Sequence, residues 1–309
     1  MRRTLTVAAA TAALLLPAGP LPVAEAGSAL PPPGKWSARE AQNFWTADRM
    51  ASAAPMTPAA AAPATDPGTG QDFDGIPVVG RMFVMKDGGA YFCTASVVAS
   101  PGRNLVLSAA HCLLGTDARQ VAFVPLYTAD NPQPYGMFPV VRAADGRSRV
   151  WIDPRYKSLG ADKGAALDVA FAQVGPDADG FPVEDVVGGN RLVTGAGYEH
   201  AKVSLIGYPA SAARPRLCVN RTTKFTSKDP GIPGSFLRID CTGYPGGTSG
   251  GPFLKNYDTV TETGDVVGVI GGWKTGGDTP DTSYSSYFGP DVKKLYEQAV
   301  AGAAAKSTP

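Results

Sequence analysis

Short apolar runs separated by Gly, Pro and Asn residues fill the chain from Gly75 onward, and this rhythm is the strongest constraint on its fold. Runs of about four to eight residues between turn signals are typical of β-strands. Their long succession predicts an all-β sandwich or barrel, and about 230 residues suit two small barrels, because single cores stop growing at a few hundred residues. The runs cover residues 76–84, 95–99, 104–107, 121–125, 169–174, 203–206, 236–239 and 266–270.

The order of these runs sets the expected domain limits. We expect the first barrel at about residues 75–180 and the second at about 190–288, joined near residues 176–193. A helix is expected over about residues 290–300, where a Pro-Asp start is followed by apolar side chains on one face, namely Val292, Leu295, Tyr296 and Ala299. We expect this helix to pack on the second barrel.

The first 26 residues have the pattern of a signal peptide. Arg2 and Arg3 precede an apolar run over residues 5–16, and an Ala-Glu-Ala cleavage sequence ends at Ala26. A membrane anchor would need about 20 continuous apolar residues, whereas prolines interrupt this run from Pro17 onward. The pattern therefore predicts a secreted, extracellular protein without stable membrane association.

Residues 27–72 are of low complexity, with three consecutive prolines and an Ala/Pro-rich stretch over residues 51–67. Only residues 36–50 offer enough apolar side chains for a short helix, and the rest is expected to be flexible. The segment is interpreted as either a propeptide or a linker, which leaves residues 73–309 for the folded domain.

The glycine-rich segment of residues 246–252 contains Ser249, which is a candidate catalytic nucleophile. Small neighbours leave a serine hydroxyl accessible and allow backbone N–H groups to converge beside it. A serine is a poor nucleophile unless a base takes its proton and donors hold the oxyanion that forms on the attacked carbonyl. A general base must therefore be found elsewhere in the chain.

The chain has two histidines, and they differ in their surroundings. His111 follows the apolar run at residues 105–107 and a small-residue turn, which is a rigid place for an imidazole. His200 lies in a glycine-rich, charged stretch that is expected to be a surface loop. His111 is therefore the candidate general base, with a purely structural histidine as the alternative.

Asp168 is the candidate for the acid that orients this imidazole. It is the only carboxylate in the apolar segment of residues 165–174, where an unpaired charge would be costly to bury. A strand-end cap or a structural salt bridge is the alternative role. Other aspartates lie among Gly, Pro or charged residues and are interpreted as solvated, namely Asp145, Asp153, Asp162, Asp177 and Asp179.

The order of the three residues separates two enzyme classes. Residues 247–251 also fit the G-x-S-x-G nucleophile elbow of α/β-hydrolases, but that fold needs its histidine after the serine, and none follows His200. The order His111, Asp168, Ser249 is instead that of the chymotrypsin-type triad.

Cysteines and charge restrict cofactors and partners. Cys93, Cys112, Cys218 and Cys241 form two sequence-local pairs that allow three connectivities, and they lack the spacing of a zinc site. We therefore expect no metal and no cofactor. A net charge of +1 without a basic patch argues against a nucleic-acid partner.

Three blocks, at residues 108–112, 167–170 and 247–252, resemble the catalytic blocks of the trypsin/chymotrypsin-like serine protease family. The resemblance spans about residues 76–300. The low number of cysteines places it nearest the bacterial secreted branch, which includes the glutamyl endopeptidases.

That resemblance implies two six-stranded antiparallel β-barrels with a C-terminal helix. It further implies Ser249 as nucleophile, His111 as general base and acid, Asp168 as orienting carboxylate, and the N–H groups of Gly247 and Ser249 as oxyanion hole. Disulfides would join Cys93 to Cys112 and Cys218 to Cys241. The implied activity is that of a monomeric serine endopeptidase acting on protein or peptide substrates through an acyl-enzyme.

Three positions depart from named members of the family. Gly243 stands where trypsin has the acid at the base of its pocket, and no histidine precedes the Gly-Gly-Trp segment, as it would in glutamyl endopeptidases. The expected specificity pocket is formed by Gly243, Tyr244, Ile270, Gly271 and Gly272. Thr248 replaces the aspartate that pairs with a new amino terminus in trypsin-type activation. A protease-fold binding protein with weak or no catalysis is the alternative function.

Overall fold

The computed structural model describes residues 36–57, 68–117, 120–143 and 146–304. The expected signal peptide at residues 1–26 lies outside these ranges. No helix within the described ranges has the length and apolar character needed to cross a membrane.

The first sheet carries the elements that surround His111 and Asp168. Its strands follow the order β7-β6-β3-β4-β5-β9-β8, and a bridge between Val140 and Val174 connects the residue after β7 to the residue after β9. Phe123 and Phe138 are fully buried in its interior. The strands are β3 (Val79–Lys86), β4 (Gly89–Val98), β5 (Leu105–Ser108), β6 (Val121–Pro125), β7 (Phe138–Pro139), β8 (Val150–Ile152) and β9 (Ala170–Gln173).

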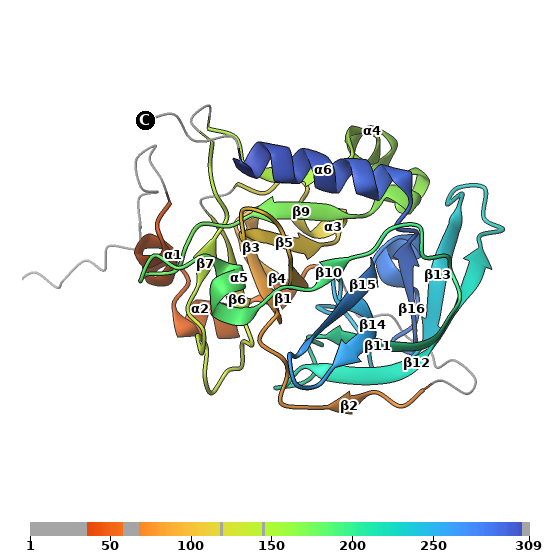
Figure 1. Cartoon of the computed structure of the whole chain (residues 1–309), viewed down its shortest axis with the longest axis horizontal. Coiled ribbons are helices and arrows are strands. Elements are labelled where there is room, and N and C mark those ends of the chain that lie inside the picture. The colour runs from red at the N-terminus through yellow and green to blue at the C-terminus, as the bar shows by residue number, and fades with distance from the viewer. Residues whose placement is uncertain (1–35, 58–67, 118–119, 144–145, 305–309) are drawn as a thin grey trace, which may run out of the picture. The chain divides into compact units, whose positions relative to one another are not determined.

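The second sheet carries the serine loop between two of its strands. Its order is β10-β15-β14-β11-β12-β13-β16, around a core that includes Leu205, Leu237 and Phe253. Figure 1 shows the two curled sheets side by side. The strands are β10 (Arg191–Leu192), β11 (His200–Gly207), β12 (Arg216–Thr226), β13 (Ser235–Asp240), β14 (Pro252–Asp258), β15 (Thr263–Val269) and β16 (Thr282–Ser286).

The expected all-β fold with two curled sheets is confirmed, but the strand count of six is too low. Each sheet has eight strands among the described residues, because β1 (Ala54–Pro55) joins β4 and β2 (Gln71–Asp72) joins β12. The pairing is antiparallel apart from β1 with β4 and β10 with β15, which are short and parallel.

The expected C-terminal helix is present as α6 (Pro290–Ala304), but it packs mainly on the first sheet, against β5, β8 and β9, and not mainly on the second as expected. Figure 1 shows α6 lying along β9. Leu295 and Ala299 are buried, the Tyr296 ring contacts Phe171, and its hydroxyl donates to the Ala99 carbonyl. The first sheet therefore offers the apolar surface that this helix covers, which residue order alone could not indicate.

Shorter helices punctuate the loops between strands. They are α3 (Ala110–Leu113), α4 (Pro154–Lys163) and α5 (Val183–Val187), with the 3₁₀ turns η2 (Ala165–Leu167) and η3 (Trp273–Gly276).

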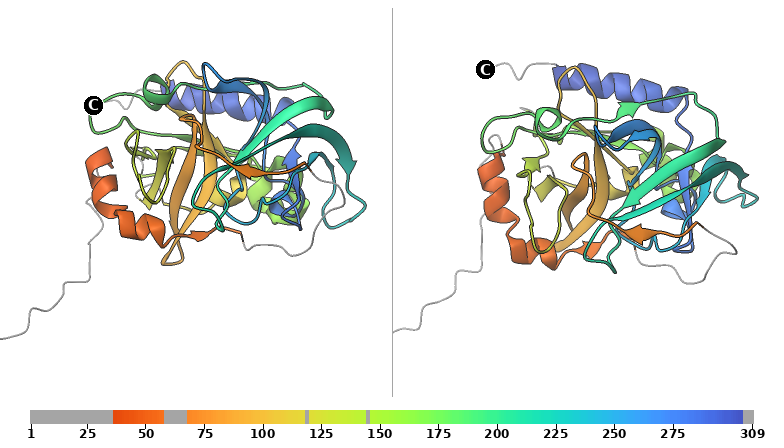
Figure 2. Two further views of the ribbon diagram at one scale, coloured as in Figure 1. Left: turned by 90° about the horizontal axis from the view of Figure 1, so that it is seen from below. Right: turned by 60° about the horizontal axis from the view of Figure 1, so that its bottom comes forward.

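Residues 36–57, here called the N-terminal strap, are folded against the first sheet. The helix expected within residues 36–50 occurs as two, α1 (Ala38–Phe44) and α2 (Ala47–Ala51). Ser37 and Glu40 form a capping box at the start of α1. Both views of Figure 2 show the strap along the first sheet. The flexible-linker interpretation therefore does not describe this part of residues 27–72.

Candidate active site

His111 lies on α3, directly after β5, and a disulfide fixes this turn to the neighbouring strand. Cys112 is bonded to Cys93 of β4, as the resemblance implies, and the second disulfide joins Cys218 to Cys241. The sulfurs of Cys93 and Cys112 and a ring nitrogen of His111 lie within 4.8 Å of one another. A disulfide has no thiolate, so this group is unsuited to a metal ion.

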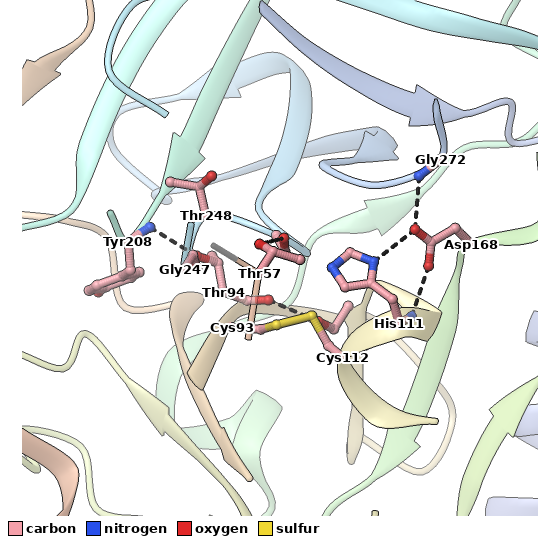
Figure 3. Close-up of a disulfide and its surroundings, with 12 residues drawn as sticks. Thr57, Cys93, Thr94, His111, Cys112, Asp168, Tyr208, Gly247, Thr248 and Gly272 are labelled. Atoms are coloured by element: carbon pink, nitrogen blue, oxygen red, sulfur yellow. Dashed lines mark hydrogen bonds and ion pairs between the residues drawn. A yellow bond between two sulfur atoms is a disulfide. The ribbon is translucent and has the colours of Figure 1, made fainter. Parts of the chain in front are cut away.

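Asp168 lies between η2 and β9, and its carboxylate is 1% exposed. Oδ2 lies 2.8 Å from Nδ1 of His111 and accepts the Gly272 N–H at 2.9 Å, while Oδ1 accepts the His111 N–H at 2.9 Å (Figure 3). Burial alone would raise the pKa of Asp168, but attraction to His111 and these hydrogen bonds outweigh it and lower the pKa. The site thus holds an ionised carboxylate against the imidazole.

The serine loop connects β13 to β14 and is held by β4 of the other sheet. Thr94 Oγ1 donates to the Gly247 carbonyl at 2.9 Å, and the Thr94 N–H donates to the Ser249 carbonyl at 2.8 Å. Gly250 has φ of +82°, and a Cβ there would lie 2.1 Å from the Thr94 carbonyl oxygen. Only glycine allows this close approach of the loop to β4.

Two N–H groups of this loop remain available for a ligand. Among the described residues, the backbone N–H groups of Gly247 and Ser249 have no hydrogen-bond acceptor. Gly247 has φ of +96°, and its carbonyl is fixed by Thr94. Free donors at these two positions are what an oxyanion hole requires.

Ser249 is 3% exposed and is hydrogen-bonded to the N-terminal strap. Its Oγ lies 3.2 Å from Oγ1 of Thr57. Nε2 of His111 is buried and has no hydrogen-bond partner in the described structure. Figure 3 shows Thr57 on the side of the His111 ring opposite Asp168. The serine loop also approaches the turn that carries His111, because a Cβ on Gly250 would lie 3.2 Å from the Ala109 nitrogen. The histidine and the serine therefore lie in one site, where the Ser249 hydroxyl is hydrogen-bonded to Thr57.

A cavity of about 220 Å³ adjoins Ser249. Two of the expected pocket residues, Tyr244 and Ile270, line it, whereas Gly243, Gly271 and Gly272 do not. A Cβ on Gly243 would meet the guanidinium of Arg216, and Gly271 and Gly272 adjoin Asp168. The remaining lining residues are Thr57, Pro245, Gly246, Thr248, Ser249, Lys274, Thr275, Gly276, Gly277, Thr279 and Pro280.

Much of that lining comes from η3 and the turn after it, which sequence reasoning missed. Lys274 and Thr275 have φ of 47° and 55°, a left-handed conformation that is rare for residues other than glycine. Lys274 pairs with Asp278 at 2.8 Å, and Oγ1 of Thr279 is buried without a partner in the described structure. No spacing in the sequence signals such a turn.

Two further residues differ from or extend the sequence expectations. His200 begins β11 and is buried, so the expected surface loop is wrong; burial is the main cause of its lowered pKa. Thr248 is buried, and its hydroxyl donates to the Pro245 carbonyl at 2.8 Å, so it stabilises the turn before Ser249.

Two curled sheets that bring a histidine–aspartate pair beside a serine loop have the architecture of chymotrypsin-like peptidases. The family model described as trypsin-like peptidase domain matches residues 93–269, more than half of the 309-residue chain. The chain therefore belongs to the trypsin-like peptidase family, as the resemblance indicated. No match to a curated protein was found by sequence.

Three solved structures with a similar fold carry the names of proteases. The protease Anisep from Arthrobacter nicotinovorans matches with a TM-score of 0.61 and 23% identity, over 75% of this chain and 99% of that one. The thermostable serine protease AL20 from an extremophilic microorganism matches with a TM-score of 0.58 and 23% identity, over 73% and 97%. A Glu endopeptidase matches with a TM-score of 0.53 and 16% identity, over 78% and 100%.

Proposed function

We propose that the protein is a secreted serine endopeptidase in which Ser249 is the nucleophile, His111 the general base and Asp168 the orienting carboxylate. Its substrates are proteins or peptides, in keeping with the family. The observation that carries the proposal is the Asp168 carboxylate, buried and bonded to His111 Nδ1 and to two backbone N–H groups. A buried charge is costly unless it is paired. Here the partner of the carboxylate is the imidazole of His111, the proposed general base, which lies beside Ser249.

The reaction follows from these atoms. The carboxylate keeps the proton of His111 on Nδ1, which leaves Nε2 free to accept the Ser249 proton as Oγ attacks the substrate carbonyl. The N–H groups of Gly247 and Ser249 then hold the oxyanion. His111 returns the proton to the leaving amine, and water hydrolyses the acyl-enzyme by the same route.

Export of the protein is supported by two independent features. The leader pattern of residues 1–26 is that of a signal peptide. All four cysteines are paired in disulfides, which persist in oxidising compartments.

Covalent labelling tests the proposed nucleophile. The secreted protein is incubated with a fluorophosphonate, with the N-terminal strap displaced as described below, and the labelled residue is identified by mass spectrometry. We expect labelling at Ser249 that is lost in Ser249→Ala and strongly reduced in His111→Ala, because removing a triad residue typically costs about 10⁴- to 10⁶-fold in rate.

Ser96→Ala is a matched control, since Ser96 is another buried serine and its hydroxyl has no partner in the described structure. This variant should label like the parent protein. A folded protein that stays unlabelled with the strap displaced would refute the endopeptidase and favour the protease-fold binding protein.

A further inference from the structure

The N-terminal strap is anchored to the first sheet by large apolar side chains. Trp45 and Met50 are both 0% exposed, and the Trp45 ring lies 5.4 Å from the ring of Phe83 on β3. Both belong to one core with residues of the first sheet. Burial of this kind holds a segment in place without any covalent link near the site.

Beyond these anchors, the backbone of the strap continues along the strand that leads to the site. Ala54 pairs with Tyr91 and Pro55 with Phe92, and the Met56 N–H donates to the Phe92 carbonyl at 3.1 Å. The next residue on β4 is Cys93, whose disulfide partner Cys112 adjoins His111. The pairing therefore directs the end of the strap into the site.

The strap ends against the serine loop. Besides the contact of Thr57 Oγ1 with Ser249, a Cβ added to Gly246 would lie 2.0 Å from the carbonyl oxygen of Thr57. Thr57 also forms part of the cavity lining beside Ser249. The group of the strap that is hydrogen-bonded to the Ser249 hydroxyl is itself a hydroxyl, which has no carbonyl carbon to attack.

A substrate needs the space that the strap fills. Its carbonyl carbon must come within about 3 Å of the nucleophile and of the oxyanion donors. Ser249 is 3% exposed, and the His111 side chain is 7% exposed, so neither can meet a peptide while Thr57 stays in place.

We propose that the N-terminal strap is an inhibitory segment, and that the surface formed by β3, β4 and Gly246 is its binding site. This inference rests on the proposed function, since it assumes that Ser249 and His111 react with substrate. Because Trp45, Met50 and the pairing with β4 hold the strap noncovalently, cutting the chain after Thr57 would leave the site blocked. Activation requires the strap to leave the sheet.

The test compares the labelling of Ser249 with the strap docked and displaced. The full secreted chain, shown by mass spectrometry to retain residues 36–57, is compared with Met50→Ala, which removes a buried anchor. We expect about hundredfold faster labelling in Met50→Ala, because the loss of a buried methionine weakens docking by about that factor. Asp48→Ala, an exposed position on the same helix, should label like the parent protein.

Hydrogen exchange at the Met56 N–H reports strap displacement independently of activity, and circular dichroism reports folding. A synthetic peptide of residues 36–57 added to Met50→Ala should slow labelling again. Fast exchange at Met56 with unchanged labelling would refute inhibition by the strap but leave the endopeptidase standing. Slow exchange at Met56 in Met50→Ala would refute the anchoring. No labelling in any folded protein with a displaced strap would refute the proposed function itself.

Discussion

Replacing Gly246 by alanine should activate the protein. The new methyl carbon would lie 2.0 Å from the carbonyl oxygen of Thr57 and 3.1 Å from Cβ of Pro55, where ordinary contacts begin at 3.4 Å. Gly246 is not among the glycines with positive φ, so alanine suits its backbone. The collision is therefore with the N-terminal strap.

The size of the effect follows from that collision. The strap must retreat by more than 1 Å, and such overpacking typically costs about 1 to 3 kcal/mol. The cost falls on the docked state alone, so the ratio of free to docked strap should rise by about 5- to 150-fold. Fluorophosphonate labelling of Ser249 should accelerate by the same factor until the strap is mostly free.

Gly175→Ala serves as the control, because its Cβ would find its nearest neighbours at 3.7 Å and its φ is not positive. Its labelling rate should be unchanged. The reasoning fails if Gly246→Ala speeds hydrogen exchange at Met56 yet leaves labelling unchanged. It also predicts that Gly246→Ala and Met50→Ala are less than additive, since both displace one segment.

Three other variants test separate parts of the structure. With the strap displaced, as in the Met50→Ala protein, Asp168→Asn should lower kcat/KM by about 10⁴-fold with the fold intact, and a loss below tenfold would remove Asp168 from the proposed triad. Removing the Cys218–Cys241 disulfide should cost about 2 to 4 kcal/mol in denaturant unfolding, and an unchanged midpoint would contradict this. Burial lowers the pKa of His200 in the folded protein below its ordinary value of 6.5. As the pH falls below 6.5, His200 of the unfolded chain is protonated before His200 of the folded protein, so the free energy of unfolding decreases. His200→Gln should lose less stability on acidification than the parent protein, and equal losses would refute this.

The candidate triad could be predicted because its chemistry narrows the choice of residues. The chain has two histidines, and one aspartate stands alone in an apolar segment before β9. Burial of Asp168 was implied by that setting, since a lone acid among strand-forming residues needs a partner. The role of Gly272, whose N–H holds the same carboxylate, had no signal, because any residue except proline carries that donor.

Elements that depend on distant partners could not be predicted. The sheet on which α6 packs is the one that leaves an apolar surface uncovered. The apolar face of α6 would suit either sheet, so the sequence pattern of the helix does not identify its partner. The N-terminal strap lies in a segment of low complexity, and its few apolar residues, which include Trp45 and Met50, are too sparse to predict that they are buried in a core. They are buried because the first sheet supplies the rest of the contact, including Phe83.

The serine loop links the proposed activity to its inhibition. With the strap displaced, the small residues before Ser249 would leave its hydroxyl and N–H groups open to a substrate. With the strap docked, the lack of a side chain at Gly246 admits the backbone of Thr57. A bulkier residue at position 246 would exclude the strap and narrow the cavity beside Ser249 at once. The small residues that the proposed catalysis requires in the serine loop also let the Thr57 backbone come close to it. Inhibition therefore requires only one further feature, a segment that is anchored firmly enough to reach the loop. The chain supplies that segment through the burial of Trp45 and Met50.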